Sequence, residues 1–492
     1  MPIRRGSDYL RSIQENHPHV YYDGREVEDI TSHPAFRVPV QTMSKMYDLQ
    51  WEDGVREKLT FSQKGSSERE GITYMIPQSV EELIRMREGL NTIYDNLYGF
   101  FGRCYDYLNM WTGVFAAHHA DFFGQPDPKY GQNVLDYHRT CMAQDLFLTH
   151  AIVAPSVDRS KQASELSDPF IQAGVVEEKS KGIVVRGAAM VSTAAPYAEQ
   201  MIYFPNMLRD PDPRYAIAFG CPTNVDGIKF LARKSFAPRQ GLGEFEYPIS
   251  ARYEESDAMV IFDDALIPWE NVFLYKQVEK VPLLMWGGVY MKAWFNYHFS
   301  VQYYSRLKFL VGLATTIAQT VGIDKFINVQ EKIGELLIYL NLTRSSIVAA
   351  EQLSEKLPNG LVRPNPEVAV ASSQFNMQAI PRAYEVIKLI SGGSLIALPS
   401  SHRDLENPEI RKYIDKYMPG KGGISAAERI KVFNLAWDVV SSEAGQRYEL
   451  YDRFSRGDPT IMWAKMYEQL QEQRDDCVKM VRRLLDSIET PK

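Results

Sequence analysis

The chain has 492 residues, of which 45% are hydrophobic, and it carries a formal net charge of −7 at neutral pH. This length and apolar content suffice for a large core and predict two to four domains. The acidic balance argues against nucleic acid or an anionic membrane surface as a partner. The N-terminal residues show no signal-peptide pattern, and no apolar run approaches the roughly 20 residues that span a bilayer, so we expect a cytoplasmic protein.

The cysteine and histidine pattern does not favour a metal site. The sequence contains no CxxC pair and no Cys/His cluster with zinc-type spacing. The adjacent His118 and His119 would point about 100° apart on a helix, so they are poorly placed to share one ion. We therefore expect no bound metal and free thiols at Cys104, Cys141, Cys221 and Cys477.

The first region, to about residue 155, turns from short extended pieces to helical patterns. Ser79 and Glu82 form a capping box, which predicts a helix start. Residues 134–148 predict a second helix. Behind the capping box, apolar side chains recur every three or four positions and so share one helix face. These are Leu83, Met86, Leu90, Ile93, Leu97 and Phe101.

The second region, about residues 156–280, has strand character. Short β-branched and aromatic runs alternate with Gly, Pro and Asp turns at 182–188, 200–205, 215–219, 227–232 and 259–268. Many short strands with frequent turns predict a small β-barrel or sandwich.

The third region, 281–492, is predicted to be helical. Ser425 and Glu428 form another capping box, and Asp458 precedes Pro459 as a cap precedes a helix start. Long helices with short links indicate a bundle. We expect them at 301–321, 328–353, 366–390, 425–442 and 459–488. The predicted fold is thus α+β and mostly α, with an N-terminal mainly helical domain (1–155), a middle β domain (156–280) and a C-terminal helical bundle (281–492).

Arg103, Tyr107 and His150 are the residues with the clearest chemical potential. Arg103 and Tyr107 lie at the end of a helical pattern, and His150 closes a mostly apolar segment. A guanidinium and an imidazole beside an acidic hydroxyl lower its pKa by charge and by hydrogen bonding. The set suits an enzyme that holds a phenol as its anion.

Several short sequence motifs, by their order and spacing, resemble those of the 4-hydroxyphenylacetate 3-hydroxylase (large oxygenase component) family over nearly the whole chain. They are residues 21–36, 103–107, 148–150, 186–188, 262–270 and 392–400. No GxGxxG follows a predicted strand, so a Rossmann-type flavin site is not supported.

The resemblance implies an acyl-CoA-dehydrogenase-like fold and the oxygenase component of a two-component flavin-dependent monooxygenase. Such an enzyme takes reduced FAD from a separate NAD(P)H:flavin reductase and uses O2, through a C4a-hydroperoxyflavin, to hydroxylate a phenol ortho to its hydroxyl. Family members are usually homotetramers. FAD rather than FMN rests on this analogy.

The resemblance also implies roles for particular residues. Arg103, Tyr107 and His150 would contact the substrate hydroxyl and act in catalysis, with His150 as the base. Asn206 and Met207 would contact the substituent opposite the hydroxyl. The cofactor would be held by His150, Ala151, Ile152, Ser156, Val157, Asp158, Arg159, Thr193, Ser455, Arg456, Gly457 and Asp458.

Two other functions stay open at this point. One is a CoA-thioester dehydratase or dehydrogenase on the same scaffold, similar to 4-hydroxybutyryl-CoA dehydratase, although the cysteine ligands of its iron–sulfur cluster are missing here. The other is a non-catalytic helical oligomer or binding protein. Within the oxygenase hypothesis, simple phenols, halophenols, hydroxyphenylacetates and tyrosine-like metabolites all remain candidate substrates.

Overall fold

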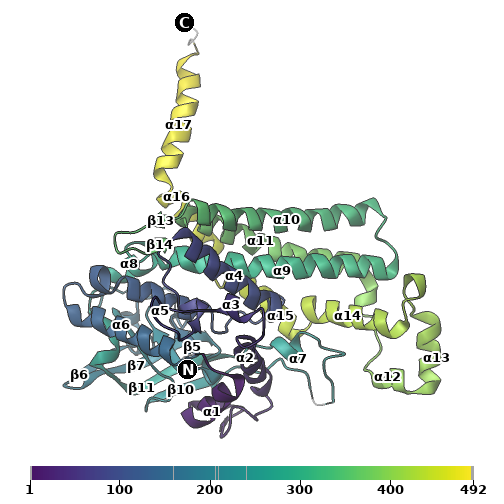
Figure 1. Ribbon diagram of the computed structural model, residues 1–492, viewed down its shortest axis with the longest axis horizontal. Helices are drawn as coiled ribbons and strands as arrows, with labels where there is room; N and C mark the ends of the chain where they lie inside the picture. The colour runs from purple at the N-terminus through teal and green to yellow at the C-terminus, as the bar shows by residue number, and fades with distance from the viewer. Residues whose placement is uncertain (1–2, 159, 206, 209, 240, 489–492) are drawn as a thin grey trace.

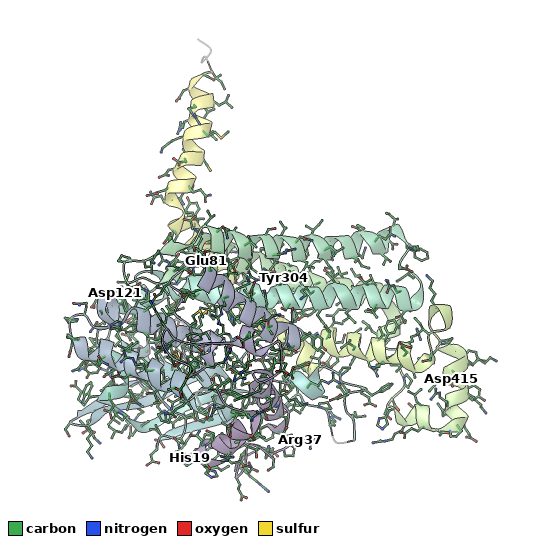
Figure 2. All side chains as sticks on the ribbon, viewed as in Figure 1. His19, Arg37, Glu81, Asp121, Tyr304 and Asp415 are labelled. Carbon is green, nitrogen blue, oxygen red and sulfur yellow. The ribbon has the colours of Figure 1, made fainter. Side chains whose placement is uncertain are left out.

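The computed structural model describes residues 3–158, 160–205, 207–208, 210–239 and 241–488. Two open β-sheets occupy one end of the molecule, and long helices extend from them toward the other end (Figure 1). Side chains in Figure 2 mark these two ends: Asp121 lies at the sheet end, Tyr304 in the helical bundle and Asp415 at the far end. The predicted order of mainly helical, β and helical regions is confirmed.

The middle of the chain forms a sandwich and not a barrel. The larger sheet has the order β2 (Arg25–Glu26), β1 (His19–Tyr22), β10 (Ile228–Ala232), β11 (Asp257–Pro268), β7 (Gly182–Thr193), β6 (Gly174–Lys179). The smaller sheet has the order β12 (Val272–Tyr275), β9 (Ile217–Pro222), β8 (Gln200–Tyr203), β5 (Leu148–Ala151). Each sheet keeps two unpaired edge strands, so the barrel alternative is wrong for the described residues. Short and charged edges such as β2 and the end of β6 discourage further pairing.

The inner faces of the two sheets share one core. The ring of Phe262 on β11 lies 5.6 Å from that of Tyr203 on β8 and 5.8 Å from that of Phe219 on β9, measured between centroids. Because side chains alternate along a strand, Val260 and Phe262 point inward together. Edge-to-face aromatic contacts of this kind add to the burial of apolar surface.

The N-terminal helices support both sheets and bundle. Helix α4 (Val80–Asn96) starts as predicted, with the Glu82 amide donating to the Ser79 hydroxyl at 3.2 Å. Helix α5 (Tyr107–Ala117) and helix α6 (Pro128–Ala143) follow. The predicted helix at 134–148 was displaced along the chain, because α6 begins at Pro128 and ends at Ala143. Asp145 takes a positive φ of 47°, which stops the helix, and residues from Leu148 gain their hydrogen bonds by pairing with β8.

The C-terminal helices confirm the predicted bundle. Helices α9 (Met291–Val321), α10 (Ile327–Gln352) and α11 (Pro366–Ser391) run side by side, and α14 (Ala426–Val440) and α15 (Glu443–Phe454) continue the layer (Figure 1). The predicted helix at 459–488 is divided into α16 (Pro459–Gln469) and α17 (Gln471–Asp486), because Leu470 between them leaves helical geometry at φ −93° and ψ 36°. Figure 1 shows α17 pointing away from the body of the molecule.

Shorter elements complete the fold. They are α1 (Gly6–Asn16), α2 (Arg37–Leu49), α3 (Arg56–Leu59), β3 (Thr60–Phe61), β4 (Glu70–Gly71), α7 (Ser250–Tyr253), α8 (Lys280–Trp286), β13 (Glu355–Lys356), β14 (Val362–Arg363), α12 (Arg403–Glu406) and α13 (Pro408–Tyr417). The domain boundaries near 155 and 280 stay predictions; β1 and β5 precede residue 156 yet pair with strands beyond it. Every helix in the described part of the chain is too short or too polar to cross a lipid bilayer.

The contact between the sheets predicts that a buried and an exposed substitution differ in their effect on the free energy of unfolding. Phe262→Ala removes a ring that is 1% exposed at the sheet interface, and we expect it to lower the free energy of unfolding by about 3–5 kcal/mol. Leu231→Ala on the neighbouring strand is the matched control. That side chain is 48% exposed, and we expect a change within about 0.5 kcal/mol. Urea denaturation measures both, and equal losses would contradict the packing described here.

Candidate functional site

Arg103 lies in the loop between α4 and α5, not at the end of a helix as the apolar stripe suggested. Helix α4 stops at Asn96, and Gly99 has a φ of +73°. A Cβ there would come within 2.5 Å of the Arg306 backbone, so a glycine lets the loop pass against α9. The Arg103 amide donates to Glu255 at 2.9 Å, and its Nη1 donates to the Gly102 carbonyl at 2.6 Å.

The structure brings Arg103, Tyr107 and His150 together. The Arg103 guanidinium carbon lies 4.1 Å from the centre of the Tyr107 ring. The Tyr107 hydroxyl and His150 Nδ1 are 2.9 Å apart. Tyr107 is the first residue of α5, and His150 lies in the centre of β5 opposite Ile202 of β8. All three side chains are buried, so a helix start, a strand and a loop supply one compact polar group.

Burial sets the protonation of this group. Burial first, and the charge of Arg103 second, lower the pKa of His150 to about 3, against a smaller opposing effect of Asp257. Burial raises the pKa of Tyr107 above its usual value, although Arg103 opposes this. At neutral pH, a neutral imidazole therefore lies beside a cationic guanidinium. That imidazole offers a neutral ring as a hydrogen-bond partner to an acidic hydroxyl, and the guanidinium favours the ionised form of that hydroxyl.

A network of ion pairs and hydrogen bonds fixes the positions of the residues around His150. Arg447 on α15 donates to Glu255 and, at 2.6 Å, to Asp257. Asp257 also receives Arg233 Nε at 2.7 Å and the Thr193 hydroxyl at 2.7 Å. Burial alone would raise the pKa of Asp257, but the two arginines outweigh it and hold the pKa below its usual range.

Thr193 in turn connects the two sheets. Its carbonyl accepts the Thr149 hydroxyl at 2.8 Å, which holds β5 next to the end of β7. The predicted cofactor contacts His150 and Thr193 therefore lie on neighbouring strands.

Three further buried polar residues adjoin this group, and the sequence analysis did not assign them to it. His298 Nε2 lies 3.2 Å from an Asp106 carboxylate oxygen and 2.7 Å from the Tyr94 hydroxyl, which also donates to Asp106. The His298 ring centre is 5.5 Å from that of Tyr107. Asp106 lies within the sequence motif at 103–107. By contrast, no local pattern connects Tyr94 on α4 with His298 on α9, because the two are 204 positions apart.

The predicted cofactor residues fall into two groups. His150, Ala151 and Ile152 lie on or just after β5. The chain then enters an exposed loop with Ser156, Val157 and Asp158, where Val157 is 63% exposed. Asp158 accepts hydrogen bonds from Ser160 and pairs with Lys161. Arg159 lies outside the described residues.

The second group lies between α15 and α16. Ser455 ends α15, Arg456 and Gly457 follow, and Asp458 caps α16 by accepting the Thr460 amide at 2.8 Å. Arg456 is fully buried, and its guanidinium carbon lies 4.5 Å from the centre of the Phe299 ring. Arg103 lies 5.2 Å from the same ring centre. The two predicted contact regions therefore meet at Phe299.

Of the two residues predicted to contact the substituent opposite the hydroxyl, Met207 is 49% exposed, and Asn206 lies outside the described residues. His118 caps the end of α5, and His119 begins the helical turn that follows. His118 Nδ1 lies 3.1 Å from both Asp121 and Asn359. Within the described ranges, no three His, Cys, Asp or Glu side chains are grouped to hold a metal ion.

The lowered pKa of His150 predicts a pH-dependent loss of stability. A folded-state pKa near 3 against 6.5 unfolded means that the unfolded chain binds the extra proton. The contribution of His150 is thus present above pH 6.5 and is lost as the pH falls toward 3. From pH 7 to pH 5 we expect the wild type to lose about 2 kcal/mol more than His150→Gln.

Urea denaturation at several pH values measures this difference. His138, whose pKa burial lowers to about 4, is present in both proteins and cancels in the comparison. Parallel pH profiles of the two proteins would show that His150 is not held neutral.

Comparison with known proteins agrees with the sequence resemblance. A family model described as 4-hydroxyphenylacetate 3-hydroxylase N terminal matches residues 5–274, and one described as its C terminal matches residues 285–486. The 4-hydroxyphenylacetate 3-monooxygenase oxygenase component of Thermus thermophilus is 36% identical over 94% of this chain and 94% of its own length. The oxygenase component of a Rhodococcus 4-nitrophenol 2-monooxygenase is 32% identical over 92% of this chain and 86% of its own.

Solved structures extend the likeness to three dimensions. The oxygenase component of 4-hydroxyphenylacetate 3-monooxygenase, complexed with FAD and 4-hydroxyphenylacetate, superposes with a TM-score of 0.92 at 34% identity, covering 99% of this chain and 100% of that one. An archaeal 4-hydroxybutyryl-CoA dehydratase from N. maritimus has a TM-score of 0.87 at 20% identity, over 100% and 97% of the two chains, which shows the shared fold alone. The chain belongs to the 4-hydroxyphenylacetate 3-hydroxylase family.

Proposed function

We propose that this chain is the oxygenase component of a two-component flavin-dependent monooxygenase, which uses reduced FAD and O2 to hydroxylate a phenol ortho to its hydroxyl. The observation that carries the proposal is the convergence of Arg103, Tyr107 and His150 at one buried point. Relatives named as oxygenase components, and a solved relative complexed with FAD and 4-hydroxyphenylacetate, support it. They do not favour the CoA-thioester alternative.

The three side chains have separate tasks in this proposal. The neutral His150 accepts the proton of the substrate hydroxyl, and Arg103 lowers the pKa of that hydroxyl by its charge. The Tyr107 hydroxyl, already bonded to His150, orients the oxygen. A phenolate pushes more electron density onto its ortho carbon than a phenol does, so deprotonation prepares the carbon that is attacked.

The residues around Phe299 fit a flavin. When bound, the reduced flavin activates O2 and supplies the electrophilic oxygen atom. Two side-chain donors there, Nε of Arg103 and Nε of Arg456, are buried and have no hydrogen-bond partner among the described residues. Arg456 and Gly457 in the turn after α15 would hold the cofactor from the bundle side, and Thr193 and Ile152 from the sheet side. Burial of the whole group excludes water.

The substrate class follows from the same placement. A phenol whose hydroxyl lies at His150 directs the substituent opposite that hydroxyl toward the loop after β8, where we place the contacts of Asn206 and Met207. The two relatives described above are named for phenols with such a para substituent. We therefore propose a para-substituted phenol as substrate.

We also propose that a separate NAD(P)H:flavin reductase supplies the reduced FAD and that the chain assembles as a homotetramer. The proposed assembly rests on α17, which leaves the body of the molecule (Figure 1). Its apolar side chains lack cover within the chain: Val478, Met480, Val481, Leu484, Leu485 and Ile488 are each at least half exposed. Apolar patches of this kind mark interaction surfaces.

Oxygen incorporation tests the activity. With a generic flavin reductase, NADH, FAD and ¹⁸O2, we expect an ortho-hydroxylated product of 4-hydroxyphenylacetate that carries one labelled oxygen atom. The reaction mixture without O2 is the control and should form no product. Label-free product, or product formed anaerobically, would rule out a monooxygenase.

Substitution of the base tests the assigned roles. We expect His150→Ala to lower the coupled hydroxylation rate by about 10²–10⁴-fold, because the proton acceptor is lost, while FAD binding is retained. His19→Ala removes a half-exposed imidazole paired with Glu26 on the surface and should leave the rate unchanged. The rate of product formation, measured with the reductase in excess, compares both variants with the wild type. A wild-type rate in His150→Ala would contradict the proposed base.

Charged substitutions on α17 test the assembly. We expect Val481→Glu combined with Leu485→Glu to lower the molar mass measured by light scattering, because carboxylates would be buried in the contact. Lys479→Glu changes a side chain that is 74% exposed on the same helix and serves as the control. An unchanged mass in the double variant would exclude α17 from the interface.

A further inference from the structure

Four Lys and Arg side chains are buried among the described residues: Arg103, Lys292, Arg306 and Arg456. Arg306 has a carboxylate partner, Asp452 at 3.1 Å. The less buried Arg447 and Arg4 also have one each, in Asp257 and Glu199. Arg306, Arg447 and Arg4 are thus paired, as the cost of burying an isolated charge requires.

Arg103, Lys292 and Arg456 are not paired in this way. Within the described chain, their side-chain hydrogen bonds go to neutral oxygens. Arg103 donates to the Gly102 carbonyl at 2.6 Å. Lys292 donates to the Arg456 carbonyl at 3.2 Å. Arg456 donates to the Ser455 hydroxyl at 2.8 Å and to a carbonyl of α15. None of the three forms an ion pair with a carboxylate of the described chain.

The carboxylates closest to these cations are already engaged. Asp452 binds Arg306, Tyr384 and Tyr303. Asp106 binds Tyr94 and His298, and Glu255 binds Arg447 and the backbone of residue 103. Glu255 and Asp452 use both of their oxygens in these contacts. Asp106 keeps one oxygen, Oδ1, without a hydrogen-bond partner among the described residues, yet it forms no ion pair with any of the three cations.

The three cations surround one pair of aromatic rings. Arg103 and Arg456 lie 5.2 and 4.5 Å from the centre of the Phe299 ring. Lys292 lies 5.2 Å from the centre of the Phe295 ring, and the two phenylalanine rings are 4.5 Å apart. Three positive charges therefore lie close together, and each raises the free-energy cost of burying the others.

Lys292 is the member of the cluster to which no role has been given so far. It is the second residue of α9, and its ammonium also lies 5.5 Å from the centre of the Trp286 ring. Burial first, and the charge of Arg456 second, lower its pKa to about 8. The ammonium is thus still the main form at neutral pH.

We propose that Lys292 is an anion-binding residue, which with Arg103 and Arg456 receives one negative charge of an organic anion lying against aromatic rings. The inference deepens the proposed function and rests on it. In that function the reduced isoalloxazine, which ionises at N1 near neutral pH, carries this charge. The carboxylate of a phenol such as 4-hydroxyphenylacetate lies at the opposite end of the ring from the hydroxyl that Arg103 and His150 hold.

Stability without ligand tests the first consequence. Lys292→Met keeps an apolar side chain of similar length and removes an uncompensated charge. We therefore expect it to raise the Tm of the ligand-free protein. Lys308→Met is the matched control on the same helix, because Lys308 is half exposed and paired with Asp95 at 2.6 Å; its Tm should change little. A lower Tm for Lys292→Met would show that the ammonium is structural and would overturn the proposal.

Anaerobic titration tests which anion is bound. If the anion is the reduced flavin, Lys292→Met should bind reduced FAD about tenfold to hundredfold more weakly, while its affinity for oxidised FAD stays within about twofold. A loss for 4-hydroxyphenylacetate that is absent for 4-methylphenol would instead place the substrate carboxylate at Lys292 and would overturn the inference. Lys292→Arg should recover most of whichever affinity is lost.

Equal affinities of wild type and Lys292→Met for both flavin forms and both phenols would overturn the inference. So would a loss of the same size for oxidised and reduced FAD together with equal losses for both phenols. Failure of the proposed function looks different, because the wild-type protein itself would then not bind reduced FAD. The two failures are therefore distinguishable in one set of titrations.

Discussion

The buried contacts of Arg447 with Glu255 and Asp257 hold the site together. Arg447 comes from α15 of the bundle, and the two acids lie at the start of β11. Glu255 also accepts the amide of Arg103, and Asp257 accepts the hydroxyl of Thr193. Removing one partner of a buried ion pair costs about 3–5 kcal/mol. The bundle, the larger sheet and the loop that carries Arg103 are thus tied to one another at a single point.

This arrangement explains how a cation and a neutral base coexist. Arg103 stays charged because an arginine does not lose its proton in a protein. His150 stays neutral because burial and the nearby guanidinium both oppose its protonation. The hydrogen bond to Tyr107 orients the imidazole without adding a charge. A single buried environment therefore supplies both a proton acceptor and an anion stabiliser.

The same scaffold carries different chemistry in other proteins. The likeness to 4-hydroxybutyryl-CoA dehydratase extends over the whole chain but only at the level of the fold. In this chain the inward-pointing charges are of two kinds. Where buried arginines such as Arg306 have carboxylate partners, they brace helices against each other. Where Arg103, Lys292 and Arg456 have none, the fold keeps positive charge for a ligand.

Much of the fold could be predicted from local sequence. Caps such as Ser79 and Ser425 define helix starts because they act on amides only three residues away. Turn residues separate the strands of the sandwich. The family resemblance singled out Arg103, Tyr107 and His150, which the structure brings close together. The sequence by itself thus determined the order of elements and most members of the buried group.

Tertiary structure decided the rest, because the deciding contacts join residues far apart in the chain. The pairing of β5 with β8 turned the predicted end of a helix into a strand. The triad of Tyr94, Asp106 and His298 spans up to 204 positions. The lack of a carboxylate partner at Lys292 depends on which acids the whole fold has already engaged. Periodicity and capping act over a few residues, whereas charge pairing depends on which distant side chains the folded chain brings within a few ångströms.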